Sequence, residues 1–176
     1  MIIYVKSRSF VKKQLSENPS WHKDKFIISI CDNGVISPFP DGSNVLKLCF
    51  DDVTDGLFCS FDKTSLLFNE EKAKQIADFI SNIPIDTEKE FFVHCAAGIS
   101  RSGAVGYVLN EWFNKFKSQN NKHYEMFSQL NPEILPNPLV VRLLKNELFG
   151  KPFSGIEVND YEYDEEGNKI DHIELI

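Results

Sequence analysis

The sequence predicts an α/β fold: a single domain with a central, mostly parallel twisted sheet and helices on both faces. Short apolar segments that suit strands alternate along the chain with longer segments of helical periodicity. The segment 90–95, EFFVHC, is almost continuously apolar, which is typical of a central strand buried on both sides. A length of 176 residues with 42% hydrophobic content suits one core rather than two.

Each element is predicted from its own pattern. A strand is favoured where apolar residues run together or alternate, and a helix where they share one face of a 3.6-residue period. Asn69 is a suitable N-cap for the helix that follows it, and Gly150 closes the last helix. We expect strands at 2–5, 25–30, 44–50 and 90–95, and helices at 9–15, 69–83, 102–116, 123–130 and 138–149.

The chain divides at Gly150. Residues 1–150 form the predicted domain, and we expect an inserted loop within it at 53–68. Residues 151–176 form an acidic extension, with eight acidic and two basic residues, that is either a hairpin or disordered.

Charge and composition exclude several classes of partner. The net charge of −7 argues against a nucleic acid, whose phosphates require clustered basic residues. No apolar run reaches the ~20 residues that cross a bilayer, so no membrane partner is expected. The four cysteines, Cys31, Cys49, Cys59 and Cys95, form no CxxC pair, which argues against zinc and favours free thiols in a reducing cytoplasm. We expect a cytoplasmic monomer.

The segment 94–102, HCAAGISRS, lies where the predicted strand 90–95 meets the predicted helix 102–116. Backbone N–H groups and the helix dipole at such a junction suit an oxyanion such as phosphate. Gly98 allows the backbone to curl, and Arg101 offers a planar fork to two anion oxygens. The segment therefore predicts a phosphate-binding loop.

The same electrostatic field acts on Cys95. A thiolate is favoured at a helix N-terminus beside a cation, which makes a cysteine there a nucleophile. The Ser102 hydroxyl can donate to the sulfur and help the thiolate to leave in a second step. A buried packing role suits Cys31, Cys49 and Cys59 better, because free cysteine is among the most buried residue types.

HCAAGISRS resembles the H-C-x-x-G-x-x-R-S/T loop of the cysteine-dependent protein tyrosine phosphatases, and specifically their small dual-specificity-like branch of bacterial and phage type. The resemblance covers residues 25–150. It implies that Cys95 is the nucleophile, that Arg101 clamps the phosphate and that Ser102 assists the breakdown of a phosphocysteine. It also implies that His94 buttresses the loop. The substrate-binding amides would come from Ala96, Ala97, Gly98, Ile99 and Ser100.

An aryl phosphate also needs a proton donor for its leaving group. The stretch NVLKLCFDDVTD offers Asp51, Asp52 and Asp55, and the resemblance favours Asp52 because of its register after the strand. Asp51, Asp55 and Asp41 stay as alternatives. No metal or other cofactor is expected, because Arg101 and the loop amides neutralise the developing charge.

The variable positions of the loop are neutral, whereas phosphoinositide-directed relatives usually carry Lys there. The resemblance therefore favours a phosphotyrosine-containing protein as substrate, with phosphoserine and phosphothreonine left open. Asn137 either bonds near the site or caps the last helix, and the cap is favoured. The alternatives are a non-catalytic phosphotyrosine-binding module, a phosphatase of phosphoinositides or other non-protein substrates, and a rhodanese- or arsenate-reductase-like thiol enzyme.

Overall fold

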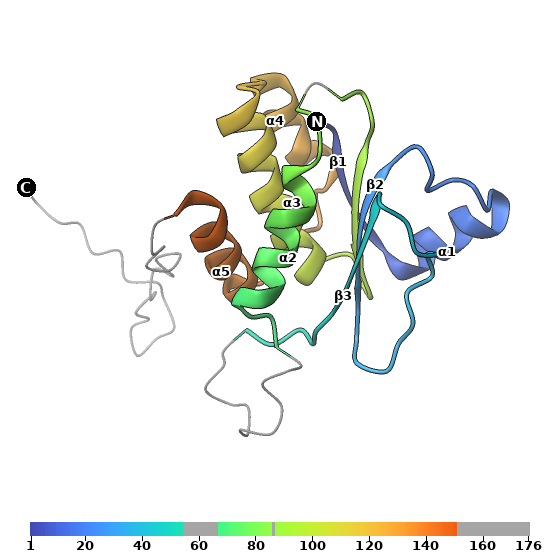
Figure 1. Cartoon of the computed structure of the whole chain (residues 1–176). Coiled ribbons are helices and arrows are strands. Elements are labelled where there is room, and N and C mark those ends of the chain that lie inside the picture. The colour runs from blue at the N-terminus through green and yellow to red at the C-terminus, as the bar shows by residue number, and fades with distance from the viewer. Residues whose placement is uncertain (55–66, 86, 151–176) are drawn as a thin grey trace, which may run out of the picture.

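The protein is represented by a computed structural model, which describes residues 1–54, 67–85 and 87–150. Its centre is a four-stranded sheet in which all strand pairs are parallel, in the order β1-β4-β2-β3 (Figure 1). The predicted α/β class with a central parallel sheet is confirmed. The strands are β1 (Ile3–Ser7), β2 (Phe26–Cys31), β3 (Val45–Cys49) and β4 (Phe91–Cys95).

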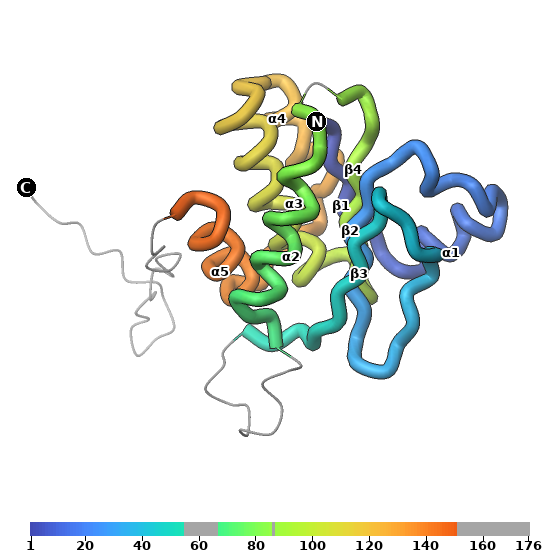
Figure 2. Tube along the Cα trace, in the orientation of Figure 1, coloured from blue at the N-terminus to red at the C-terminus, as the bar shows by residue number. Residues whose placement is uncertain are grey.

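Helices cover both faces of the sheet, as predicted. The helix α1 lies on one face, and the other helices lie on the opposite face (Figures 1 and 2). They are α1 (Arg8–Glu17), α2 (Glu70–Ser81), α3 (Arg101–Asn110), the π-helix η3 (Glu111–Lys117), α4 (Asn121–Leu130) and α5 (Pro138–Phe149). In the described part of the chain, no helix is both long and apolar enough to cross a membrane.

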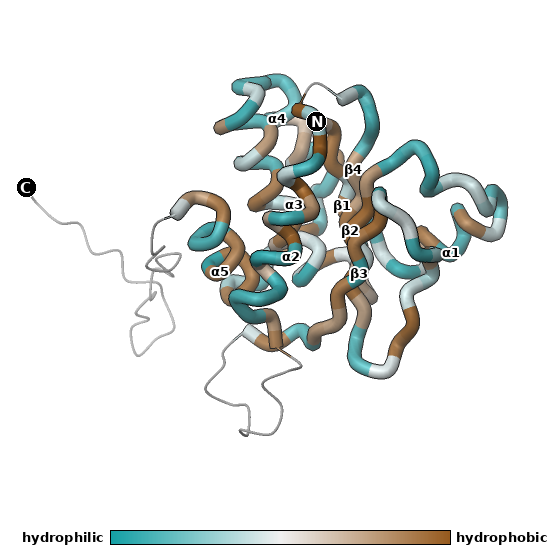
Figure 3. The backbone as a smooth tube through the Cα atoms, viewed as in Figure 1, coloured by the Kyte–Doolittle hydropathy of each residue, from teal (hydrophilic) through white to brown (hydrophobic). Residues whose placement is uncertain are grey.

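The central strand β4 connects two apolar clusters, and all five of its residues are buried. Side chains alternate across a strand, so Phe91 and Val93 enter the larger cluster, whereas Phe92 enters the smaller one beneath α1. Figure 3 shows the apolar residues concentrated where the helices meet the sheet. Cys95 belongs to the larger cluster, and the central two-sided position predicted for 90–95 is confirmed.

The predicted helix 102–116 changes its winding partway. After α3 the chain continues as the π-helix η3, and the amide of Ser118 donates to the Phe113 carbonyl at 2.9 Å, five residues earlier. The wider turn accompanies the burial of Asn114, whose side chain accepts a bond from the Met1 amino group at 2.8 Å. Apolar periodicity alone could not reveal this change. A π-turn holds only about one residue more than an α-turn, and this difference is too small to recognise over the seven residues of η3.

Several predicted ends of elements agree with the structure. The Asn69 side chain accepts from the Lys72 amide and caps α2, and Gly150 ends α5 in the left-handed conformation at φ 64°. The predicted extension 151–176 and most of the predicted loop 53–68 lie outside the described residues.

Candidate active site

The site forms where the parallel strands end. Ser7 is in register with Cys95 on the neighbouring strand, so the loops that follow β1 and β4 meet at one edge of the sheet. The Arg8 amide donates to the Ala96 carbonyl at 3.2 Å. Gly98 adopts φ 81°, and a Cβ at this position would lie 2.6 Å from the Lys6 carbonyl carbon. Only glycine fits both requirements, so the loop can curl tightly against β1.

The thiol of Cys95 lies at the base of this loop and is 2% exposed. Its Sγ is 3.0 Å from Ser102 Oγ and accepts a bond from the Gly98 amide at 3.3 Å. Burial, the largest single effect, raises the pKa of Cys95. The Ser102 hydroxyl and the amides of Ser102, Gly98 and Ile99 together outweigh it, so the pKa lies below its usual value. Donors converge on the sulfur and favour the thiolate.

The start of α3 differs from the starts of the other α-helices in the described chain. Ser100 occupies its N-cap position, but the Ser100 side chain makes no cap bond. Side chains of Ser7, Asn69, Asn120 and Asn137 do cap α1, α2, α4 and α5. No side-chain cap therefore occupies the first amides of α3, and the Ser102 amide instead points to the Cys95 sulfur, an arrangement that suits an anion at this helix start.

Arg101 is buried beside the thiol loop, with 4% of its surface exposed. Its Nη1 donates to the Phe50 carbonyl at 2.8 Å and lies 2.7 Å from Asp32 Oδ1. Its Nε is buried and has no hydrogen-bond partner among the described residues. Since buried N–H groups are rarely left unpaired, the edge of the guanidinium that carries Nε suits an anionic ligand.

Asp32 contacts Arg101 and also Arg8, and both Asp32 and Arg8 were missed from the sequence. Asp32 directly follows β2, and its Oδ2 accepts a bond from Arg8 Nη2 at 2.9 Å. The hydrogen bond from Arg8, and then contacts with Arg101, hold the pKa of Asp32 below its usual value although burial opposes the shift. The positions of Arg8 and Asp32 at strand ends were a signal, because the carboxyl ends of parallel strands share one edge.

Asp52 lies at the rim of the loop. Its Oδ1 accepts bonds from Ser100 Oγ at 2.7 Å and from Asn137 Nδ2 at 2.8 Å. Both of these bonds end on the same oxygen of the carboxylate, Oδ1. Asn137 also caps α5 by accepting from the Val140 amide at 3.2 Å. The two alternatives foreseen for Asn137, a cap and a bond near the site, therefore occur together.

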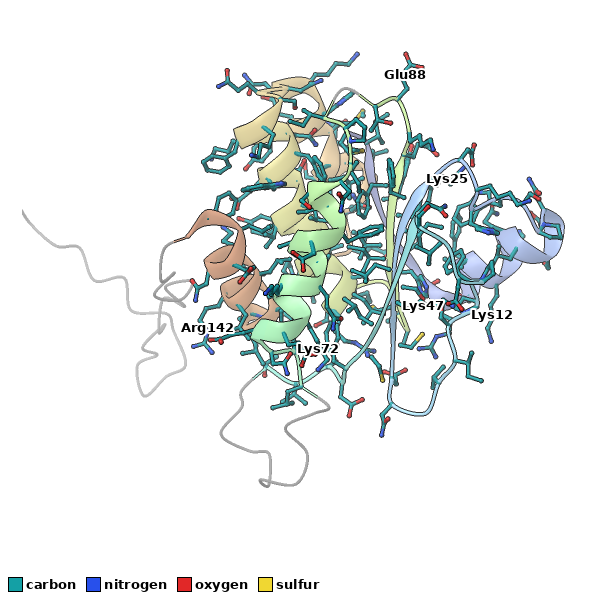
Figure 4. The ribbon with its side chains drawn as sticks, in the orientation of Figure 1. Lys12, Lys25, Lys47, Lys72, Glu88 and Arg142 are labelled. Atoms are coloured by element: carbon teal, nitrogen blue, oxygen red, sulfur yellow. The ribbon has the colours of Figure 1, made fainter. Side chains whose placement is uncertain are left out.

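The other candidate acids are placed differently. Asp41 is exposed and pairs with Lys47, which Figure 4 labels on β3, at 2.7 Å. Asp51 is partly buried next to Asp52, and Asp55 lies outside the described residues. Of the described candidates, Asp52 is the one whose carboxylate bonds to a residue of the loop.

His94 supports the loop from within the sheet. It is fully buried, and its Nε2 lies 2.7 Å from Ser29 Oγ on β2. Burial is the largest cause that lowers the pKa of His94, to about 4, and the charge of Arg8 acts in the same direction. His94 is therefore neutral at neutral pH and joins β4 to β2.

The loop that precedes α5 supports the same segment from outside. The Leu135 amide donates to the Ile99 carbonyl at 3.3 Å, and the Asn137 amide donates to the Ser100 carbonyl at 3.2 Å. The carbonyls of these loop residues are thereby occupied. Among the described residues, no group of three or more His, Cys, Asp or Glu could hold a metal ion.

The fold and the loop together describe an α/β protein with a buried thiol at the base of a loop that leads into a helix start without a side-chain cap. No family model and no curated protein matches the sequence. Solved structures that are similar include the human tyrosine phosphatase-like serine/threonine/tyrosine-interacting protein, with 20% identity over 74% of this chain and 82% of that chain and a TM-score of 0.47. Tk-PTP in its active form has 15% identity over 85% and 92%, with a TM-score of 0.49.

OH1 from the Orf virus, a tyrosine phosphatase, has 16% identity over 85% of this chain and 84% of that chain, with a TM-score of 0.45. These similarities are distant, so the assignment of an activity depends on the geometry of the site.

Proposed function

We propose that the protein is a phosphatase that hydrolyses phosphotyrosine in proteins through a phosphocysteine intermediate, without a metal or another cofactor. The observation that carries the proposal is the pairing of two features in one short loop. The Cys95 sulfur accepts converging hydrogen bonds, and the buried Nε of Arg101 has no partner among the described residues. A phosphate ester would use both, because its oxygens match the guanidinium and its phosphorus faces a nucleophile.

In the first step, the amides of residues 96–100 and Arg101 hold the phosphoryl oxygens. The Cys95 thiolate attacks phosphorus, an S–P bond forms, and the bond from phosphorus to the phenolic oxygen breaks. Asp52 gives its proton to the departing phenolate. The negative charge on the equatorial oxygens is stabilised by donors that are already in place.

In the second step, the Asp52 carboxylate takes a proton from a water molecule as the oxygen of that water attacks phosphorus. The S–P bond breaks, and the electron pair returns to Cys95. The Ser102 hydroxyl, 3.0 Å from the sulfur, stabilises the thiolate that leaves. Inorganic phosphate is released, and the protein returns to its starting state.

The neutral loop positions support a phosphoprotein rather than a phosphoinositide. Ala96, Ala97, Ile99 and Ser100 offer no charge to further phosphate groups. We extend the proposal to a monomeric protein acting in the cytoplasm, with phosphotyrosine as the preferred residue and phosphoserine and phosphothreonine as the comparison in an assay.

Turnover of p-nitrophenyl phosphate and of a phosphotyrosine peptide tests the proposal. Cys95→Ser should abolish both while tungstate binding survives, because serine lacks an ionised nucleophile but leaves the amides in place. Binding of the peptide by the wild type without any hydrolysis would favour the non-catalytic module instead.

Asp52→Asn tests the acid. Its turnover should fall by about a hundredfold on phenyl phosphate, and by less on p-nitrophenyl phosphate, whose leaving group needs less protonation. Asp51→Asn is the matched control one residue away. If Asp51→Asn loses activity and Asp52→Asn keeps it, the assigned register is wrong by one residue.

A further inference from the structure

We propose that Arg8 is a second cation of the site, which acts through Asp32 so that Asp32 positions Arg101 without cancelling its charge. The inference rests on the proposed function only in the identity of the ligand, a phosphate monoester. Arg8 is a positioning residue in this proposal, because it touches Asp32 rather than the reacting atoms.

The fold places Arg8 beside the loop. Arg8 is the first residue after β1, the strand in register with β4, and its amide donates to the Ala96 carbonyl at 3.2 Å. Its side chain is only 18% exposed, although it carries a charge and begins a surface helix. Its Nη2 lies 2.9 Å from Asp32 Oδ2, whereas Arg101 Nη1 lies 2.7 Å from Oδ1. One carboxylate thus joins two guanidinium groups from different elements.

The charges of this arrangement explain why two arginines are useful. Asp32 with Arg101 alone would be a neutral pair, and a neutral pair attracts a phosphate dianion weakly. Arg8 adds one positive charge, so the cluster of Arg8, Asp32 and Arg101 carries a net charge of +1. A phosphate monoester carries about −2 at neutral pH, and the Cys95 thiolate adds another negative charge. Asp32 can then fix the orientation of Arg101 while the cluster stays attractive to the ligand.

A direct contact between Arg8 and a second anionic group of the substrate is the competing explanation. The contacts of Arg8 favour the indirect role, because Nη2 is bonded to Asp32 Oδ2. Its Nε is buried and, like that of Arg101, has no hydrogen-bond partner among the described residues, so the experiment has to separate the two roles. A purely structural role for Arg8 is the other alternative. The proposal predicts that neutralising Asp32 in a variant without Arg8 restores the affinity for an anion. Direct contact of Arg8 with the substrate and a purely structural role of Arg8 both predict no such recovery.

The test measures the affinity for tungstate and inorganic phosphate by calorimetry, and KM and kcat for p-nitrophenyl phosphate. Arg8→Met should weaken anion binding and raise KM by about tenfold, with kcat changed less than about threefold, because one charge near the ligand is lost. Arg8→Lys should stay within about threefold of the wild type, because it keeps the charge. Lys13→Met is the matched control, since Lys13 lies on the same helix in an exposed pair with Glu17.

The decisive variant is Arg8→Met combined with Asp32→Asn. The amide introduced by Asp32→Asn would keep an oxygen that accepts from Arg101 Nη1, and the cluster would regain its net charge of +1. Most of the lost affinity should return. If the double variant binds tungstate as weakly as Arg8→Met, or if Arg8→Met itself binds within twofold of the wild type, the inference is wrong.

Folding and function can be separated in this experiment. Thermal unfolding of each variant shows whether the fold is intact, and Arg8→Gln, which keeps a hydrogen-bonding side chain, replaces Arg8→Met if the latter does not fold. Tungstate and phosphate binding needs no turnover. A wild type that binds tungstate and hydrolyses no ester would therefore overturn the proposed function while the binding comparison still decides the role of Arg8. A weakening seen with a doubly phosphorylated peptide but not with tungstate would overturn the inference in favour of direct contact.

Discussion

Two ion pairs with a buried cation have the same length and different surroundings. Arg101 and Asp32 lie 2.7 Å apart at the carboxyl edge of the sheet, and Lys145 and Glu111 lie 2.7 Å apart between α5 and η3. Both partners of the second pair are buried, with 9% and 11% of their side chains exposed. In the first pair, Arg101 is 5% exposed but Asp32 is 37% exposed, and Arg101 Nε has no described partner.

We call the Lys145–Glu111 pair the closed pair, because both of its members make a further contact within the protein, with Tyr107. The Arg101–Asp32 pair is the open pair. Lys145 also lies 5.0 Å from the Tyr107 ring, and Glu111 accepts a bond from the Tyr107 hydroxyl at 3.4 Å. Burial, and then the charge of Glu111, raise the pKa of Tyr107 to about 12, so this group stays neutral at ordinary pH. The two pairs therefore use a buried charge differently. Lys145 and Glu111 direct their polar groups to partners within the protein, whereas Arg101 keeps its Nε donor for a ligand.

Replacing Arg101, the cation of the open pair, should have the largest effect on activity. Arg101→Lys should lower kcat/KM by about a thousandfold, because lysine cannot hold Asp32 and the Phe50 carbonyl and also offer a fork to phosphate. Stability should change little by comparison. Steady-state kinetics and urea unfolding measure the two effects. An Arg101→Lys variant with activity within tenfold of the wild type would show that bidentate binding is not needed.

Replacing Lys145, the cation of the closed pair, should lower stability and leave activity nearly unchanged. Lys145→Met should destabilise the fold by about 3 kcal/mol, because Glu111 would be left as an uncompensated buried charge. The kcat/KM of the folded fraction should stay within about twofold. Adding Glu111→Gln should recover much of the stability. A loss of activity without a loss of stability in Lys145→Met would break the distinction between the pairs.

The two regions should also differ in how pH changes the free energy of unfolding. The site region contains His94, and the region of the Lys145–Glu111 pair contains Tyr107. His94, with a folded pKa of about 4, should be neutral in the native state and protonated in the unfolded state between pH ~6.5 and ~4. The unfolded state then binds more protons, so the free energy of unfolding should fall as pH falls across this window. The loss should be smaller in total than about 3 kcal/mol, the limit set by the pKa difference.

Urea unfolding at several pH values measures this loss. His123, whose pKa burial also lowers, contributes in the same direction. His94→Gln is therefore the comparison to make, since it should flatten the dependence and leave the share of His123. Tyr107, in the closed region, should be silent in this window because its pKa is about 12. An unchanged slope in His94→Gln would mean that His94 does not stay neutral in the native state.

The loop 94–102 could be predicted from the sequence because its contacts are local. Cys95, Gly98, Arg101 and Ser102 lie within one strand-to-helix junction, and the bonds from the Cys95 sulfur to Ser102 and Gly98 span seven residues or fewer. The parallel sheet was likewise predictable, because each strand carries its own apolar pattern. Local sequence patterns were therefore enough to predict the loop at the centre of the site and the sheet that carries it.

The surroundings of Arg101 were not predictable in this way. Asp32 and Phe50, which directly follow β2 and β3, both bond to Arg101, and the strand order that brings them together is a property of the tertiary fold. The bond from Asn137 to Asp52 joins residues 85 positions apart. Asp32 was not among the predicted site residues, since a carboxylate after a strand has many roles and its partner is not visible in sequence.

The ionisation of Cys95 tests the account most directly. The rate of alkylation of the wild type, compared with that of Cys95→Ser to remove the contribution of the other cysteines, gives the pKa of this thiol. We predict a midpoint clearly below the ~8.5 of a free cysteine, because hydrogen bonds to the sulfur outweigh its burial. A midpoint at or above ~8.5 would mean that burial wins, and that this loop holds no nucleophile ready at neutral pH.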